Sequence, residues 1–403
     1  ILAQVFEGVL LPVGCLAQFA FCLVYHSLTM QSIALALACL ACVGQARRVL
    51  HSTGEKSLEA VSSHALAELS SESEEKGNFK VVVCGGAGGI GQPLAMLMTM
   101  NPNVAEVVVY DLTISAIPAA GVAADLSHLD KKAAVTSSVK SLEEKAIDVL
   151  GDAFAGASLV LVPAGLPRKP GQTRDDLFKV NAGIAKEVVE AAAKYCPDAI
   201  LALIVNPVNS IVPAMAELYK KKGLDPHKIV GVTSLDVVRA NKFVAEIVGV
   251  NPADVAVPVI GGHAGVTIMP VFSQDQYAKT IPADQIPALD EHVQNAGTDV
   301  VNAKGGKGSA TLSMAYAGAR LGSAVLAGLA GSPTKECAYV MSDVVEGLPY
   351  FTSYVTFGTK GVETVHGIGE LNKYETERLE EAKAALKKEI QSGLDYAENN
   401  TLA

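Results

Sequence analysis

Three glycines at regular spacing could hold a dinucleotide. Gly85, Gly88 and Gly91 follow the β-branched run Lys80–Cys84 and precede a helical pattern. Gly85 permits a tight turn, Gly88 lets the backbone approach a pyrophosphate, and Gly91 lets the helix pack against the strand. Ile90 belongs to the same turn, and the phosphates would face the first N–H groups of the helix. The pattern predicts the first strand, turn and helix of a dinucleotide-binding domain.

A carboxylate in the right place strengthens this interpretation. A second apolar strand, Glu106–Tyr110, ends in Asp111, twenty residues beyond Gly91. A carboxylate there would bind the ribose hydroxyls and would repel an added 2′-phosphate, which favours NAD over NADP. The alternative is a glycine turn in an ordinary α/β protein, but strand, glycines, helix, strand and acid follow in the order that NAD binding requires.

Two arginines and one histidine are the next candidates for chemistry. Arg168 and Arg174 stand six residues apart in Leu166–Leu177, a segment with Pro and Gly near its start, as is typical of a mobile loop. Of the eight histidines, His263 is the one in a glycine-rich apolar turn. Solvated charges are the alternative for the arginines, and a satisfied core or surface residue is the alternative for the histidine.

The elements that would position these residues alternate along the chain. Strands are predicted at Ser158–Pro163 and Ala199–Val205, and helices at Asn181–Lys194 and Ser210–Lys222. Such alternation predicts an α/β fold with a parallel, doubly wound sheet. The C-terminal run Leu371–Tyr396 has apolar residues at helical spacing, which predicts an amphipathic helix on the second domain.

Length and charge narrow the class of protein. At 403 residues the chain is too long for one ordinary hydrophobic core, so two domains and an extra segment are expected. The net charge of −10 and the lack of a dense basic run argue against nucleic-acid binding. A small dianionic substrate would need a local cluster of arginines to offset this charge.

The cysteines do not suggest a disulfide framework or a metal site. Of the seven in the chain, four lie in the apolar N-terminal stretch, and only Cys84, Cys196 and Cys337 belong to the body. No short Cys or His spacing predicts a zinc site. The three are expected to be buried structural thiols.

Residues 1–78 are predicted to be a targeting or linker segment. Residues 8–46 contain no Asp, Glu, Lys or Arg, and the part from Met30 to Ala46 resembles a signal peptide with its cleavage site. The Ser/Glu/Ala-rich remainder is typical of a linker. A bipartite plastid address and a mitochondrial presequence are the alternatives for its role, and a retained membrane anchor at residues 8–25 is a third.

Five ordered motifs carry a family resemblance. They are the glycine turn, the arginine loop, Val205–Asn209 (VNPVN), Leu235–Arg239 (LDVVR) and Gly261–Gly265 (GGHAG). From about Lys80 to Asn400 the chain resembles the malate dehydrogenases of mitochondrial and bacterial type. The resemblance implies a Rossmann-type NAD-binding domain at 79–231, a mixed α/β substrate domain at 232–403, and usually a homodimer. The N-terminal segment predicts an organellar location, mitochondrial matrix or plastid, after its removal.

The resemblance also assigns roles to the motif residues. His263 matches the histidine that takes the hydroxyl proton of malate, and Asp236 the carboxylate that holds it. Arg239 matches the residue that grips the C1 carboxylate with a planar, two-pronged contact. Arg174 matches the loop arginine that polarises the reacting carbonyl. Arg168 matches the position that selects a second carboxylate, where lactate dehydrogenases carry an uncharged side chain.

Three further positions are assigned in the same way. Asn206 matches a residue that contacts the substrate carbonyl and the nicotinamide ribose, and Asn181 a further asparagine on the substrate and cofactor side. Met314 would lie against the nicotinamide ring, with core packing as its alternative. Two other functions stay open at this point: a lactate or other 2-hydroxyacid dehydrogenase, and a catalytically silent NAD-binding protein.

Overall fold

The computed structural model of the chain describes residues 78–166 and 174–403, without the side chains of 174–176. Nearly all of the predicted targeting segment, including the alternative membrane anchor, lies outside these residues. Arg168 also lies outside them, as does the side chain of Arg174. The predictions about these parts therefore stay predictions.

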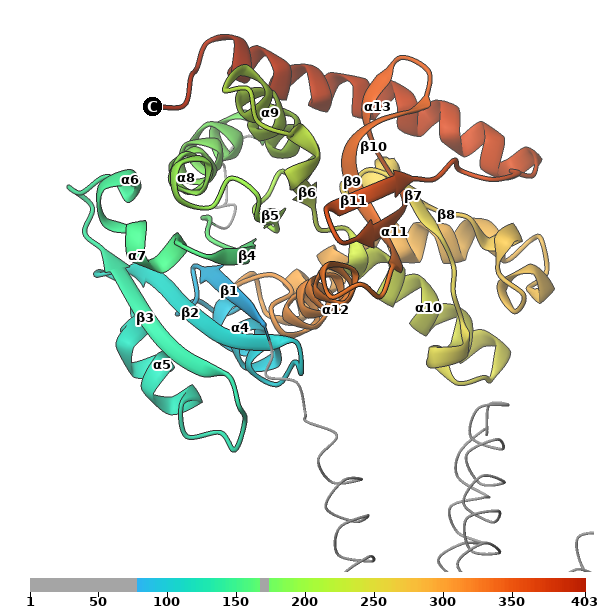
Figure 1. Cartoon of the computed structure of the whole chain (residues 1–403). Coiled ribbons are helices and arrows are strands. Elements are labelled where there is room, and N and C mark those ends of the chain that lie inside the picture. Colours follow the sequence, from blue (N-terminus) through green and yellow to red (C-terminus); the bar gives the residue numbers. More distant parts are fainter. Residues whose placement is uncertain (1–77, 167–173) are drawn as a thin grey trace, which may run out of the picture. The chain divides into compact units, whose positions relative to one another are not determined.

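A parallel sheet forms the N-terminal half of the described chain (Figure 1). Its strand order is β3-β2-β1-β4-β5-β6, which is the order of the classic dinucleotide-binding fold. Neighbouring strands in this half all pair in parallel. The strands are β1 (Phe79–Cys84), β2 (Val104–Leu112), β3 (Ala134–Lys140), β4 (Ala157–Val162), β5 (Ile200–Leu203) and β6 (Ile229–Gly231).

The same sheet continues into an antiparallel half. Gly231 of β6 pairs with Tyr339 of β9, Tyr339 pairs with Thr352 of β10, and Thr352 pairs with Gly261 of β7. The sheet therefore runs without a break from the first half of the chain into the second. The strands of this half are β7 (Val259–Gly261), β8 (Ile268–Pro270), β9 (Thr334–Val345), β10 (Leu348–Gly358) and β11 (Gly361–Val365).

Helices cover both faces of the sheet because its buried strands are apolar on both sides. In β1, Val82 and Cys84 join a core cluster with three helices, α8 (Arg174–Tyr195), α9 (Val208–Lys221) and α13 (Lys373–Glu398). Val81 and Val83 join a second cluster with α4 (Gly91–Thr99), α5 (Ala119–Leu126) and α12 (Leu312–Leu329). Side chains of a strand alternate between faces, so an uninterrupted apolar run needs helices on each side. A third cluster joins α10 (Ser234–Val248) and α11 (Ile286–Ala303) to β7 and β8.

Helices α8 and α9 end within one residue of their predicted ends at Lys194 and Lys222, but α8 begins seven residues before its predicted start at Asn181. The long helices are α4 (Gly91–Thr99), α5 (Ala119–Leu126), α8 (Arg174–Tyr195), α9 (Val208–Lys221), α10 (Ser234–Val248), α11 (Ile286–Ala303), α12 (Leu312–Leu329) and α13 (Lys373–Glu398). Short helices are α6 (Ala146–Val149), α7 (Gly151–Phe154) and 3-10 turns at Pro226–Lys228, Pro252–Asp254, Gly265–Thr267, Phe272–Gln274 and Ala278–Thr280. The predicted doubly wound α/β fold with a second α/β part is confirmed.

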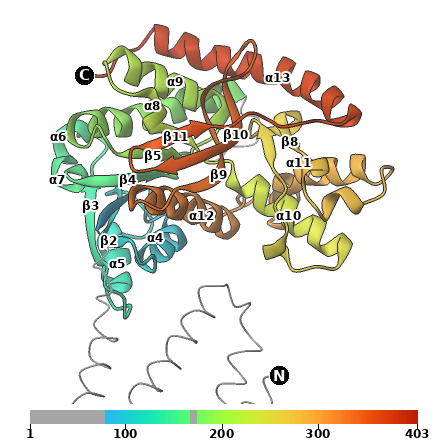
Figure 2. The same ribbon diagram turned by 45° about the vertical axis from the view of Figure 1, so that its right-hand side comes forward.

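Two helices of the C-terminal half pack on elements of the N-terminal half. In both views α13 runs across α9 (Figures 1 and 2). In the part of the chain that the structure describes, α12 is the one helix long and apolar enough to cross a membrane by length and composition. It packs against α4, α10 and the sheet, and most of it is buried, so it is a core helix of this fold.

Candidate active site

The glycine turn after β1 is shaped so that side chains would not fit. Gly85 has φ of +87°, and a Cβ there would lie 2.8 Å from the Cα of Ala164 at the end of β4. A Cβ on Gly88 would lie 3.2 Å from the carbonyl oxygen of Gly85, and one on Gly91 would collide with that same oxygen. The tight turn leaves the backbone bare at the N-terminus of α4, as phosphate binding requires.

Asp111 closes this site on the side of β2. Its Oδ2 accepts a hydrogen bond from the backbone N–H of Ala87 (2.9 Å), so the carboxylate lies beside the glycine turn. Its Oδ1 accepts from the N–H of Leu112 (2.8 Å) and from the Ser115 hydroxyl (2.5 Å). The side chain is only partly buried, and Ile90, just before α4, is partly buried as well. A bare turn with an adjacent carboxylate fits a dinucleotide with free ribose hydroxyls.

The ends of β4 and β5 meet through Asn181. Its Nδ2 donates to the carbonyl oxygens of Leu166 (3.1 Å) and Asn206 (2.7 Å), and its Oδ1 accepts from the N–H of Leu166 (2.8 Å). The side chain is 1% exposed. Asn181 therefore positions the start of the arginine loop and the turn after β5, and its amide is already committed to backbone groups. Asn206, in contrast, is exposed and available for a ligand.

His263 and Asp236 form a close pair. The Nδ1 of His263 lies 2.5 Å from Oδ2 of Asp236. Asp236 stands in the first turn of α10, where the positive end of the helix dipole stabilises a carboxylate. Its side chain is 0% exposed and that of His263 is 12% exposed. The pair thus has a buried anion and a histidine whose second ring nitrogen remains for a substrate.

Arg239 lies one turn along α10 from Asp236. Its Nη1 is 3.7 Å from Oδ1 of Asp236, which is a loose ion pair, and that oxygen has no hydrogen-bond partner among the described residues. Burial lowers the pKa of Arg239, while the nearby charges of Asp236 and Asp299 act to raise it. A largely buried guanidinium with so loose an ion pair can still donate hydrogen bonds to the carboxylate of a ligand.

Met314 of α12 is buried in the core, with 6% of its surface exposed, among residues of the second cluster. The core-packing alternative accounts for this position, and contact with a nicotinamide ring stays a prediction. Arg168 and the side chain of Arg174 lie outside the described residues, so their predicted approach to the substrate also stays a prediction.

Two residues that the motifs did not assign, Asn209 and Glu389, are linked to the backbone of His263. Asn209 of α9 accepts from the N–H of His263, and it donates to Thr267 and to Glu389 of α13. The last residue of the NPVN motif was the available signal for Asn209. Nothing in the local sequence marks Glu389, because it contacts Asn209 across 180 positions of the chain.

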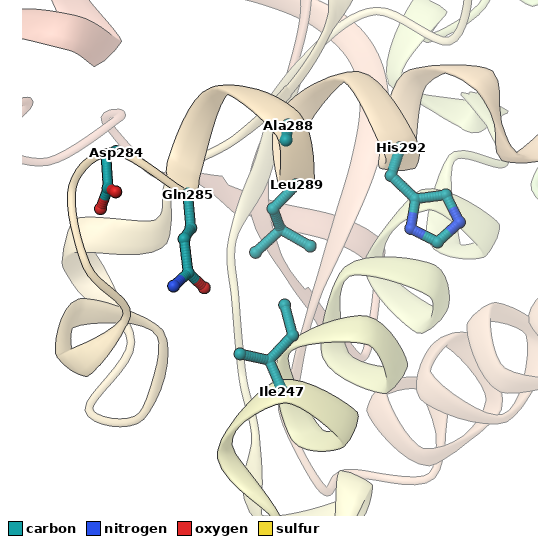
Figure 3. A pocket seen from close by; sticks show the side chains of 6 residues that line it. All are labelled: Ile247, Asp284, Gln285, Ala288, Leu289 and His292. Atoms are coloured by element: carbon teal, nitrogen blue, oxygen red, sulfur yellow. The ribbon is translucent and has the colours of Figure 1, made fainter.

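A shallow pocket elsewhere contains none of the predicted site residues. It lies between the end of α10 and the start of α11 and is lined by Ile247, Asp284, Gln285, Ala288, Leu289 and His292 (Figure 3). Its polar side chains are those of Asp284, Gln285 and His292. Among the described residues, no group of three His, Cys, Asp or Glu side chains could hold a metal ion.

Comparisons with known proteins agree with this arrangement. Residues 79–231 match the sequence model of the lactate/malate dehydrogenase NAD binding domain, and residues 233–397 that of the lactate/malate dehydrogenase alpha/beta C-terminal domain. A glyoxysomal malate dehydrogenase of Citrullus lanatus is 52% identical over 320 residues, which are 79% of this chain and 87% of that protein. The mitochondrial malate dehydrogenase of the same plant is 49% identical over 354 residues, 87% of this chain and 99% of that protein.

Solved structures give the same result. The malate dehydrogenase of Picrophilus torridus in its apo form superposes with a TM-score of 0.68 at 25% identity, covering 80% of this chain and 99% of its own. A lactate dehydrogenase of Cryptosporidium parvum, complexed with lactic acid and nicotinamide adenine dinucleotide, superposes with a TM-score of 0.65 at 26% identity, covering 78% and 98%. The predicted NAD cofactor is confirmed by the matched binding domain. The chain therefore belongs to the lactate/malate dehydrogenase family.

Proposed function

We propose that the chain catalyses the reversible, NAD-dependent interconversion of malate and oxaloacetate. The observation that carries this proposal is the pair of His263 and Asp236 at 2.5 Å, with Arg239 one turn away. Oxidation of a 2-hydroxy acid needs a base for the hydroxyl proton and a cation for the carboxylate, and this cluster supplies both. The choice of substrate is supported by the malate dehydrogenases that are about 50% identical in sequence to this chain.

Each residue has a separate role in the proposed reaction. His263 takes the proton of the C2 hydroxyl on the ring nitrogen that faces away from Asp236, and Asp236 stabilises the imidazolium that forms. Arg239 holds the C1 carboxylate. When NAD is bound, its nicotinamide ring accepts the hydride that leaves C2. In the reverse direction His263 returns the proton to the carbonyl oxygen of oxaloacetate.

The cofactor is held by backbone at one end and by carboxylate at the other. The glycine turn presents N–H groups and the start of α4 to the pyrophosphate. Asp111, which accepts from the backbone N–H of Ala87, would accept from the ribose hydroxyls and would repel a 2′-phosphate. The assignments of Gly85, Gly88 and Asn206 to cofactor binding belong to this proposal, as do the domain limits 79–231 and 232–403.

Selection of a dicarboxylate is assigned to Arg168, and polarisation of the carbonyl to Arg174. An Arg168 enclosed beside the methyl group of pyruvate would be an unpaired buried charge, which costs on the order of 3–5 kcal/mol. A lactate dehydrogenase is the second candidate, since such enzymes share the fold. The relatives at about 50% identity favour the first.

The test is the oxidation of NADH by the purified chain, with oxaloacetate and pyruvate compared, and NADH compared with NADPH. Fast turnover with oxaloacetate and NADH alone is the expected result. Turnover with pyruvate would favour the lactate alternative, and no turnover with either would favour a silent NAD-binding protein. Arg168→Gln should lower oxaloacetate turnover selectively. If it does not, Arg168 is not the selector.

We also propose that the chain forms a homodimer. Helices α4 and α12 pack against each other and carry exposed apolar side chains. These are Met96 on α4, Met100 just after it, and Tyr316 on α12. Exposed apolar groups near one another favour association. Sedimentation of the wild type should give a dimer, and Met100→Glu should shift it toward monomer. A wild-type monomer would contradict the proposal.

An organellar location is proposed for the mature enzyme, with mitochondrial matrix or plastid as the compartments. Among the similar proteins are mitochondrial malate dehydrogenases of Citrullus lanatus and Chlamydomonas reinhardtii, the latter 51% identical over 318 residues, 79% of this chain and 82% of that protein. Glyoxysomal relatives make import a necessary test. Import of the labelled chain into isolated mitochondria and plastids, with sequencing of the processed N-terminus, would decide.

A further inference from the structure

We propose that Glu389 on the C-terminal helix positions His263, by fixing the orientation of the Asn209 side chain that holds the His263 backbone. The inference rests on the proposed function for the role of His263. Glu389 is not among the residues that the sequence motifs assign to the reaction, and its contact with Asn209 is the one that carries the inference. The link runs through three hydrogen bonds around one buried amide.

The Asn209 amide is held from three directions. Its Oδ1 accepts from the backbone N–H of His263 at 2.7 Å, and its Nδ2 donates to Oε2 of Glu389 at 2.6 Å and to Oγ1 of Thr267 at 3.1 Å. The backbone carbonyl of Asn209 accepts from the buried Tyr339 hydroxyl at 3.2 Å. The side chain is 1% exposed, so water does not compete for these bonds. Asn209 therefore fixes the backbone of the turn that carries His263.

The orientation of this amide depends on Glu389. A carboxylate only accepts hydrogen bonds and a backbone N–H only donates them. With Nδ2 toward Glu389, Oδ1 faces His263, and both contacts are favourable. The reversed amide would place an oxygen against the carboxylate and an N–H₂ group against the N–H of His263. The carboxylate therefore selects the one orientation that holds His263.

Two glycines show that the packing around Asn209 is tight. A Cβ on Gly262 would lie 2.6 Å from Nδ2 and 2.7 Å from Oδ1 of Asn209, so the residue before His263 has room for no side chain. On α13, a Cβ on Gly393 would collide with the carbonyl oxygen of Ser210, the residue after Asn209. Gly393 stands one turn from Glu389 on the same helix face, and it lets α13 approach α9 closely enough for the carboxylate to reach.

The test replaces the acceptor by a donor. Glu389→Lys should lower kcat for oxaloacetate by roughly 10- to 100-fold, the scale expected when a catalytic group is displaced by up to about 1 Å. KM for oxaloacetate and the Kd of NADH should change less than kcat, because the Asn209 side chain holds the backbone N–H of His263. The primary isotope effect with NADH deuterated at the transferred position should rise, because the chemical step becomes slower relative to product release.

Controls separate positioning from general damage. Glu389→Gln keeps an acceptor oxygen and should restore kcat to within about threefold, as expected for a neutral substitute that can still accept from Asn209. Glu377→Lys makes the same charge change at a largely exposed position of α13, where the ion pair with Lys373 is loose, and should leave kcat unchanged. If Glu389→Lys does not fold, Glu389→Leu removes the acceptor without adding charge and should lower kcat in the same direction.

Hydrogen exchange gives a readout that does not depend on activity. The backbone N–H of His263 should exchange faster in Glu389→Lys than in the wild type, and no faster in Glu377→Lys. Unchanged exchange at His263 together with unchanged kcat would overturn the inference. A wild type that exchanges as expected but does not reduce oxaloacetate would instead overturn the proposed function and leave the positioning role intact.

Discussion

Replacement of Asp236 by asparagine tests the centre of the proposed mechanism. Asp236 is fully buried and lies 2.5 Å from Nδ1 of His263. Its second oxygen has the loose contact with Arg239 at 3.7 Å. The carboxylate charge is thus shared between one histidine and one arginine, and the neutral amide removes it from both while it keeps the size of the side chain.

The expected loss of rate follows from the hydrogen bond. A bond to a charged partner contributes about 1.5–3 kcal/mol, which corresponds to roughly 10- to 150-fold in rate. An amide N–H₂ turned toward Nδ1 would also force the wrong tautomer, and an Asp-to-Asn change of that kind costs about 10⁴ in a serine protease triad. We expect kcat for malate oxidation to fall by about 10²- to 10⁴-fold.

Substrate binding should not weaken in Asp236→Asn, although kcat falls. Without the Asp236 charge, Arg239 loses its nearest anion, so its attraction for the substrate carboxylate does not weaken. Because KM reports the binding of substrate in the ground state, it should stay within about threefold of the wild-type value or fall. Steady-state assays in both directions, with the Kd of NADH from fluorescence, measure these quantities.

Asp275→Asn is the matched control. This carboxylate is also buried, and within residues 78–166 and 174–403 it accepts only from the backbone N–H groups of Ala256, Tyr277 and Ala278. Its replacement should lower the free energy of unfolding without a selective loss of kcat. If Asp236→Asn keeps kcat within threefold of wild type, or if the two variants lose kcat equally, the charge of Asp236 has no role in catalysis.

Three further outcomes are expected. Gly91→Ala should weaken NADH binding at least tenfold and lower the free energy of unfolding by about 1–3 kcal/mol through overpacking. Gly121→Ala is the control, because the added Cβ meets no atom within 4 Å, and it should change neither quantity. Equal NADH titrations for the two variants would contradict this prediction. Arg239→Lys should raise KM for oxaloacetate by roughly 10- to 100-fold with little change in kcat, because Lys cannot form the bidentate contact; an unchanged KM would remove Arg239 from the site. Burial raises the pKa of Cys196 and of Cys337 from 9.0 to about 12. The folded chain then keeps these protons while the unfolded chain loses them, so stability is retained below pH 9 and falls by about 1.4 kcal/mol per thiol for each pH unit above it. Urea unfolding at pH 8 and 10 would show the difference, and equal stability at the two values would refute it.

The sequence predicts the first half of the fold well because its signals are local. The run before Gly85, the glycine turn and the carboxylate at Asp111 lie within one strand–helix–strand unit, and the structure places them together. Strand β3 was not predicted. It is the edge strand of the sheet and is mostly exposed, so its residues, AVTSSVK, show no buried apolar face. An edge strand is fixed by pairing with its neighbour, which composition does not reveal.

The candidate site was predictable as far as its motifs reach. His263, Asp236 and Arg239 were found from short sequence patterns, and the structure brings all three together. The amide of Asn181 makes three backbone hydrogen bonds that the sequence did not predict, and its contact with a ligand stays a prediction. Glu389 could not be found, since it is one of many Glu residues on a polar helix and only tertiary packing distinguishes it.

The reacting pair also depends on the far end of the chain. Asp236 follows β6 and His263 follows β7, yet these strands are not neighbours. Strands β9 and β10 lie between them, through the pairs Gly231–Tyr339 and Thr352–Gly261. Tyr339 also donates to the backbone carbonyl of Asn209, and Glu389 of α13 accepts from the side chain of Asn209. The geometry at 2.5 Å is therefore set by residues about a hundred positions downstream, so the motif residues form a site only within the completed sheet.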